Sequence, residues 1–243
     1  MILPETPYPQ IYKKMCDEAE KVRFRFKRNS NKVMKDYLRC PTSTGLFTET
    51  YTVPASGNTY CIWYDVISEK DQCFCDGDWF LVVKDRSGRN MYFSINRVNT
   101  YLPWLGEDRP STIFNVYDAH FVSRYRQRMH FGQKASSDML MARFACVNEE
   151  RFVQVDIEKL NLKSAQLREI ADFRPYECRD GVCFATVQWE TLPDGSRLRV
   201  HRYNTFLSRE MLFPNQKKAL LSSRLGDFFF DRRFPVDKFI AKH

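Results

Sequence analysis

Hydrophobic residues recur at two different spacings in the first part of the chain, and each spacing predicts a different element. Over residues 8–36, apolar positions such as Ile11, Met15, Ala19 and Val22 recur every three or four residues, which predicts an amphipathic helix. Between residues 45 and 98 apolar and polar residues alternate, which predicts a meander of antiparallel strands. The expected strands are 46–53, 59–67, 79–83 and 91–95, with a hairpin turn at DRSGRN between the last two.

The second part of the chain is richer in helical spacing. A connector over residues 99–110 leads to a short strand at 111–116 and then to a helix that Asp118 can cap and Gly132 can end. Ser136 or Ser137 can cap the next helix. The remaining elements are expected to be helices at 137–147 and 157–173, a hairpin of strands 183–190 and 197–206, and a helix from 214 to about 223.

These elements predict an α+β fold: an antiparallel sheet with an N-terminal helix, central helices and a C-terminal hairpin plus helix. Residues 1–110 (helix and meander) and 111–243 (helices and hairpin) can be two domains or one continuous globule. A chain of 243 residues with 43% hydrophobic content is long enough for either arrangement. Asp71, Asp76 and Asp78 are interpreted as a loop, because a calcium loop has regularly spaced carboxylates and ends on a glutamate.

Charge adds a preference for polyanionic partners. The formal net charge is +8, and basic residues gather at 21–32, 124–128 and 197–202. This composition favours nucleic acid, although a basic run can also be the solvated face of a helix. No apolar run is long enough to span a membrane and the first ten residues do not resemble a signal peptide. We therefore expect a cytoplasmic protein without a membrane partner.

The eight cysteines do not follow the paired CxxC spacing of structural zinc sites. A zinc site built from Cys73, Cys75, Cys178 and Cys183 is an open alternative, but free thiols are the default inside cells. The sequence also lacks HExxH, GxxxxGK[ST] and GxGxxG motifs. We accordingly expect neither a metal nor a cofactor.

The stretch YDAHFVSRYRQRMH at residues 117–130 carries the most specific chemistry. In a helix His120, Arg124 and Arg128 lie four apart on one face, which puts one titratable imidazole in line with two permanent cations. Such a row suits a phosphate group beside a site of proton transfer. His130 is about a quarter turn away from the His120 face and is not expected to join it.

A strand at 197–206 can complete this site. On a strand His201 shares a face with Arg199, Tyr203 and Thr205, whereas Arg202 points the other way. Metal-independent RNA cleavage needs a base for the ribose 2′-OH, an acid for the leaving oxygen and cations for the phosphorane. The candidate catalytic residues are therefore His120, Arg124, Arg128, His201 and Thr205. The candidate substrate-binding residues are Tyr125, Arg199 and Tyr203.

A His-x3-Arg-x3-Arg helix followed by an antiparallel hairpin ending in Thr205-Phe206 resembles the nuclease superfamily of barnase, EndoU, colicin nuclease domains and RelE-like toxins, including its phage and mobile-element members. The resemblance covers about residues 111–216. It implies a helix packed on a small antiparallel sheet, with His120, Arg124, Arg128 and Thr205 facing RNA. The helical insert between the helix and the hairpin departs from the smallest members.

Two functions follow as hypotheses. The first is a metal-independent ribonuclease or toxin-like RNA-cleaving protein of bacterial or phage origin, in which His120 is the general acid or base. The alternative is a non-catalytic module of a mobile-element system that binds nucleic acid or a protein partner such as an antitoxin. A third possibility is that these residues have only a structural role, because His120 can form a hydrogen bond within the fold. Arg124 and Arg128 can likewise form surface ion pairs with Asp118, Glu149 or Glu150.

Overall fold

The computed structural model describes residues 1–41, 44–69, 72–102, 107–132, 134–148, 153–155, 160 and 173–220. Within these residues, the elements are a long N-terminal helix followed by five strands, two shorter helices, four more strands and a short C-terminal helix. They are α1 (Tyr8–Arg39), β1 (Leu46–Thr52), β2 (Thr59–Glu69), β3 (Gln72–Lys84), β4 (Asn90–Leu102), β5 (Glu107–Tyr117), α2 (Ala119–Arg128), α3 (Ser137–Asn148), β6 (Val153–Gln154), β7 (Phe173–Cys178), β8 (Gly181–Thr191), β9 (Arg197–Ser208), a 3₁₀ turn (Arg209–Met211) and α5 (Pro214–Ala219). The fold is α+β, as the sequence predicts.

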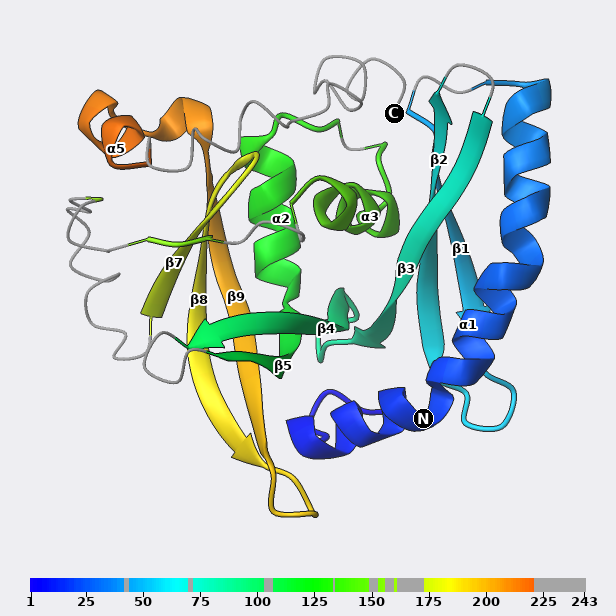
Figure 1. Cartoon of the computed structure of the whole chain (residues 1–243), viewed down its shortest axis with the longest axis horizontal. Helices are drawn as coiled ribbons and strands as arrows, with labels where there is room; N and C mark the ends of the chain where they lie inside the picture. The colour runs from blue at the N-terminus through cyan, green and yellow to red at the C-terminus, as the bar shows by residue number, and fades with distance from the viewer. Residues whose placement is uncertain are drawn as a thin grey trace.

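The strands form one sheet in the order β1-β2-β3-β4-β5-β9-β8-β7-β6. Neighbouring strands are antiparallel except β5 and β9, which run parallel and join the N-terminal meander to the C-terminal hairpin. Figure 1 shows β1–β3 and β7–β9 as two sides of a bent sheet, with α2 and α3 between them and α1 outside β1–β3. Residue 110, where the two regions of the sequence meet, therefore lies inside β5.

Helix α1 packs on one face of the sheet through the apolar stripe that its spacing predicts. Ile11, Met15 and Val22 join a buried cluster with residues of β2–β5 and β9. A buried carboxylate fixes the helix further, because Glu18 accepts hydrogen bonds from Asn58 Nδ2 (3.0 Å) and Tyr60 Oη (2.8 Å). The long helix is thus held by both apolar burial and charged hydrogen bonds, which are stronger than neutral ones.

Helices α2 and α3 pack on the opposite face. Their buried side chains, including Phe121, Tyr125 and Phe144, form an aromatic core with Tyr117 and Tyr203 of the sheet. The rings of Tyr117 and Tyr203 stack at 4.6 Å, and Phe121 and Phe144 meet edge to face at 5.2 Å. Because β5 runs into α2 through a single residue, Asp118, this core also sets where α2 lies on the sheet.

Several local predictions are corrected by strand pairing. Asp76 and Asp78 lie within β3 rather than in a loop, because residues 72–82 of β3 pair with β2 and Gly77 lets the Trp63 carbonyl approach. Asp71 lies outside the described residues. The expected connector is mostly strand, since Asn99 and Pro110 are partners in the β4–β5 pair.

The predicted turns and helix ends can be compared in the same way. The hairpin at DRSGRN forms, with a hydrogen bond from Gly88 N to Asp85 O (2.9 Å). The chain turns out of α2 at His130, whose φ is 55°, so the prediction that Gly132 ends this helix is wrong. Histidine is among the residues that enter this conformation more readily than most. The predicted helix at 157–173 falls almost entirely outside the described residues, and 173 itself begins β7.

Candidate functional site

Helix α2 is fixed at its start and along one side, which leaves its other side to the solvent. The Asp118 side chain accepts a hydrogen bond from Phe121 N (2.8 Å), the N-cap expected from the sequence. Phe121, Tyr125 and Met129 are buried in the aromatic core. Because helical residues four apart share a face, burial of this stripe turns the stripe of His120 outward.

The expected row forms on this outward side. His120 is exposed, and Arg124 Nε lies 3.4 Å from His120 Nε2. Arg124 also donates to Gln127 Oε1 at 3.1 Å, a polar neighbour that the sequence argument missed although it lies three residues away on the same helix. Partial burial and the nearby charge of Arg124 lower the pKa of Arg128. The three side chains therefore form one continuous row (the α2 row: His120, Arg124 and Arg128).

The row is joined to the sheet at its far end. Arg128 Nη1 donates to the carbonyl oxygen of Phe206 and lies 3.4 Å from Thr205 Oγ1. Pairing of β9 with β5 ends at Tyr203, and α2 packs along β9. The Arg128 side chain thus lies beside β9 just beyond the point where its pairing with β5 ends. Helix and strand lie side by side, as the sequence hypothesis required.

Carboxylates do not neutralise the row within the described part of the chain. Asp118, one of the proposed partners, instead forms an ion pair with Arg202 (3.6 Å), and Glu149 and Glu150 lie outside the described residues. Among described residues no ion pair of Arg124 or Arg128 is found. The row therefore presents positive charge to the solvent.

His201 occupies a different environment from His120. Its side chain is buried, with 3% exposed, and its ring lies 5.1 Å from Tyr176 and 6.4 Å from Tyr203. Burial, together with the charge of Arg199, lowers the pKa of His201 to about 3. A neutral imidazole is a very weak acid, and this one is buried, so the geometry does not support His201 as a general acid.

Thr205 does not share the face of His201, which corrects the parity expected from the sequence. Tyr203 pairs with Ala185 and Thr205 pairs with Phe184, so one extra residue of β9, Asn204, bulges from the ladder. Ala185 and Phe184 are consecutive and belong to clusters on opposite faces. A bulge reverses the side-chain alternation that simple counting assumes.

The other candidate substrate-binding residues have structural partners. Tyr203 is buried in the aromatic core, and Arg199 Nη2 lies 3.4 Å from Tyr176 Oη. Tyr125 is buried and donates to Asp180 Oδ2 at 2.6 Å. Tyr125 and Tyr203 therefore point into the core and not toward the solvent-exposed side of α2 that carries the row.

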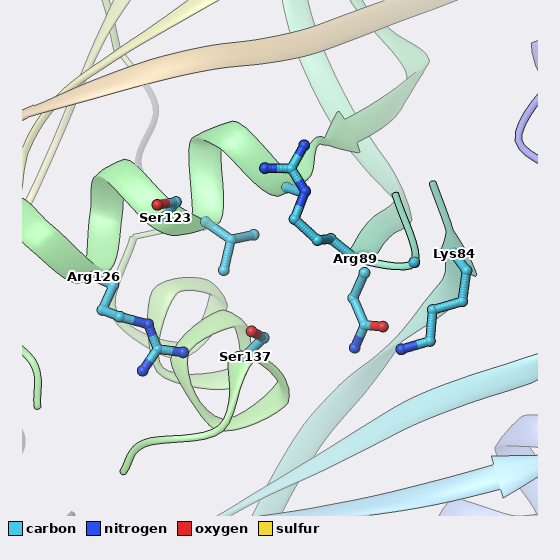
Figure 2. A pocket seen from close by; sticks show the side chains of 9 residues that line it. Lys84, Arg89, Ser123, Arg126 and Ser137 are labelled. Atoms are coloured by element: carbon cyan, nitrogen blue, oxygen red, sulfur yellow. The ribbon is translucent and has the colours of Figure 1, made fainter. Parts of the chain in front are cut away.

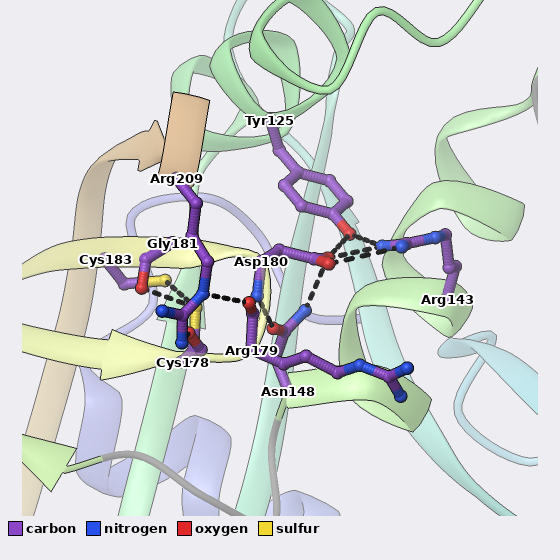
Figure 3. Close-up of polar contacts among 9 residues, drawn as sticks. All are labelled: Tyr125, Arg143, Asn148, Cys178, Arg179, Asp180, Gly181, Cys183 and Arg209. Atoms are coloured by element: carbon purple, nitrogen blue, oxygen red, sulfur yellow. Dashed lines mark hydrogen bonds and ion pairs between the residues drawn. The ribbon is translucent and has the colours of Figure 1, made fainter. Parts of the chain in front are cut away.

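A buried polar network surrounds Asp180 and ties α2 and α3 to the β7–β8 turn (Figure 3). Arg143 forms an ion pair with Asp180, and Asn148 Nδ2 donates to Asp180 Oδ2 at 3.0 Å. Although burial opposes ionisation of Asp180, Arg143 and the hydrogen-bond donors of the network lower its pKa. The network stabilises the buried side of α2 and explains why Tyr125 is unavailable to a substrate.

The cysteines that raised the zinc alternative lie in separate parts of the sheet. Cys178 and Cys183 are buried in β7 and β8, with their Sγ atoms 3.7 Å apart, and burial raises the pKa of Cys183. Cys73 and Cys75 lie on β3, and strands β4, β5 and β9 separate that strand from β8. Among the described residues no group of three or more side chains suited to a metal ion is found.

Comparison with known proteins does not extend this description. No protein-family model matches the chain, and neither a curated protein nor a solved structure is significantly similar to it. Among the described residues, no helix is both long and apolar enough to cross a membrane.

Proposed function

We propose that this protein binds RNA through the α2 row. The observation that carries the proposal is the row itself: His120, Arg124 and Arg128 are consecutive on one side of a helix, and the described part of the chain offers Arg124 and Arg128 no carboxylate partner. Phosphate contacts supply most of the affinity of proteins for nucleic acid, and Arg side chains make such contacts with paired N–H groups. His120 and Arg128 are eight positions apart on the helix, so the row extends about 12 Å, enough to follow the backbone of an RNA strand.

The two other basic clusters support this assignment less well. On α1, Arg25 already pairs with Glu49, and Arg23 pairs with Glu20. On β9, Arg202 pairs with Asp118, while the Arg197 guanidinium lies over the Trp189 ring at 4.8 Å. A cation that already has a partner gives less to a phosphate. The exposed Lys21, Lys27, Arg28 and Lys32 of α1 form no ion pair with a described residue, but only the α2 row has an arginine in contact with a histidine side chain. We therefore assign the phosphate contacts to the α2 row.

Binding of a single-stranded RNA at several salt concentrations tests the proposal. Arg124→Met removes one cation but no contact to the sheet, and we expect weaker binding with a log Kd–log salt slope reduced by about 0.7, the value for one phosphate contact on a single strand. Arg28→Met is the matched control, because Arg28 is exposed, forms no ion pair with a described residue and lies on α1, which packs on the opposite face of the sheet.

Three results would reject RNA binding by this row. Arg124→Met could leave both the affinity and the salt slope unchanged. RNA could fail to bind the folded wild-type protein while single-stranded DNA binds. A partner that binds with no salt dependence would instead indicate a protein interface.

Metal-independent RNA cleavage is a second candidate function, and the contact between His120 and Arg124 favours it. On this proposal His120 takes the proton of a ribose 2′-OH, and the oxygen attacks the phosphorus held by Arg124 and Arg128. The P–O5′ bond breaks, leaving a 2′,3′-cyclic phosphate and a 5′-oxygen that takes a proton from water. Water fills the acid role because His201 is buried and neutral.

Incubation with mixed RNA in EDTA tests cleavage separately from binding. We expect wild type to yield cyclic phosphate ends, and His120→Gln to bind RNA without cleaving it. Cleavage by both proteins would exclude His120 as the base. RNA binding without cleavage by wild type would reject the ribonuclease and leave the binding function.

A further inference from the structure

A cavity of about 340 Å³ lies between the β3–β4 turn, α2 and the start of α3. Figure 2 shows Lys84 and Arg89 on one side of the cavity and Ser123, Arg126 and Ser137 on the other. None of the described residues that line it is acidic. Three cations, two from the β3–β4 hairpin and one from α2, thus face one small space, which favours an anionic ligand.

The cations differ in how firmly they are held. Arg126 Nη1 donates to the carbonyl oxygens of Gly132 (3.1 Å) and Ala135 (2.6 Å), which fix its position without cancelling its charge. Lys84 is exposed and forms no ion pair with any residue that the structure describes. An ammonium group with three donors and no partner is the group best able to bind an incoming anion.

Asp85 and Asp138, which follow the lining residues Lys84 and Ser137 in the chain, already have hydrogen-bond donors of their own. Asp85 pairs with Arg89 (3.2 Å) and accepts hydrogen bonds within its turn, which lower its pKa to about 2. Asp138 accepts from Tyr92 Oη at 2.6 Å and from Asn90 Nδ2 at 3.3 Å. Neither carboxylate therefore takes the donors that point to the cavity from α2 and α3.

The remaining groups of the cavity suit an oxygen-rich ligand that also carries hydroxyl groups. Ser123 and Ser137 offer hydroxyl donors, and Ser137 begins the twelve-residue helix α3, whose positive end attracts anions. Asn90 also lines the cavity, and its buried Oδ1 atom accepts no hydrogen bond from the described residues. A sugar hydroxyl or a base amino group can donate to that atom while the phosphate group stays with the cations, whereas inorganic phosphate has only its own protonated oxygen to donate.

We propose that this cavity binds a small phosphate monoester, of the class of nucleoside monophosphates. The cations and the start of α3 hold the phosphate, and Asn90 accepts a hydrogen bond from the rest of the ligand. The volume is at the lower end of the range for small-molecule pockets, which suits a single nucleotide. Arg126 and Arg128 are two residues apart and so lie about 200° apart around α2. The cavity is thus distinct from the α2 row, and the proposal stands without the proposed RNA binding.

Calorimetric titration with uridine 5′-monophosphate tests the proposal on the full chain. We expect wild type to bind it, uridine without phosphate to give no heat, and Lys84→Met to weaken binding at least tenfold. Arg86→Met is the matched control, because Arg86 is in the same turn but pairs with Glu5 and does not line the cavity. Ser137→Ala provides a second variant that changes no charge, and we expect it to weaken binding by a smaller factor.

Two further ligands separate the possible sources of the phosphate. Inorganic phosphate should bind more weakly than the nucleotide, and a 5′-phosphorylated tetranucleotide should bind no better than the mononucleotide. The proposal is overturned if no phosphate compound binds folded wild type or if Lys84→Met binds as well as Arg86→Met. Tighter binding of the tetranucleotide, dependent on its 5′-phosphate, would overturn the small-molecule assignment in favour of an RNA end.

Discussion

Burial of His201 makes a measurable prediction about acid stability. The folded-state pKa of His201, about 3, lies below the ordinary histidine value of about 6.5. Between these two pH values the imidazole is protonated in the unfolded chain but not in the folded protein. Stability must therefore fall as pH decreases from about 6.5 toward 3. Between pH 7 and pH 5 this single group should cost about 2 kcal/mol, at about 1.4 kcal/mol for each pH unit below the unfolded pKa.

The variant His201→Phe removes this proton while keeping a flat ring between Tyr176 and Tyr203. The substitution removes no hydrogen bond of His201 Nε2, because that atom has no partner among the described residues. Urea unfolding at pH 7 and pH 5 should show that wild type loses about 2 kcal/mol more between the two pH values than the variant does. His120→Phe, at an exposed site, should retain the wild-type loss. Equal losses in wild type and His201→Phe would refute the reasoning.

Two further predictions concern the parts that hold α2 and β8 in place. Arg143→Met leaves the Asp180 carboxylate buried without its cation and should lower the free energy of unfolding by about 3–5 kcal/mol. The double variant with Asp180→Asn should recover part of that loss in urea unfolding, and no recovery would argue against the ion pair. In wild type the stabilisation by the Asp180 carboxylate is fully present above the ordinary carboxyl pKa of about 3.9. It is lost as the pH falls through the lower folded-state pKa of Asp180. Acid titration should therefore destabilise wild type over a pH interval in which the double variant shows no such loss. Gly181→Ala places a Cβ 1.9 Å from Leu207 O and should cost about 3 kcal/mol, against about 1 kcal/mol for Gly195→Ala, which has a positive φ but open space. Thermal melts of the two glycine variants compare these costs, and a larger loss at Gly195 would contradict the close approach of β8 and β9.

Local patterns predicted the elements that local forces decide. The apolar stripe of α1, the Asp118 cap of α2 and the turn at DRSGRN each depend on residues close in sequence, and each forms as expected. The placing of α2 beside β9 was also anticipated, but only as one possibility. The strands β6 and β7 were missed, because their hydrogen bonds depend on β8 and not on a pattern of their own.

The sequence by itself determined the α+β class and the order of His120, Arg124 and Arg128 along one helix face, because helical geometry relates positions four apart wherever the helix lies. Only the tertiary structure decided which titratable groups reach solvent. Alternation placed His201 beside Thr205, but the bulge at Asn204 separates their faces and the neighbouring strands bury the imidazole. Burial and pKa depend on residues far apart in the chain, such as Tyr176 and Arg199 around His201, and no local pattern records which of them will meet.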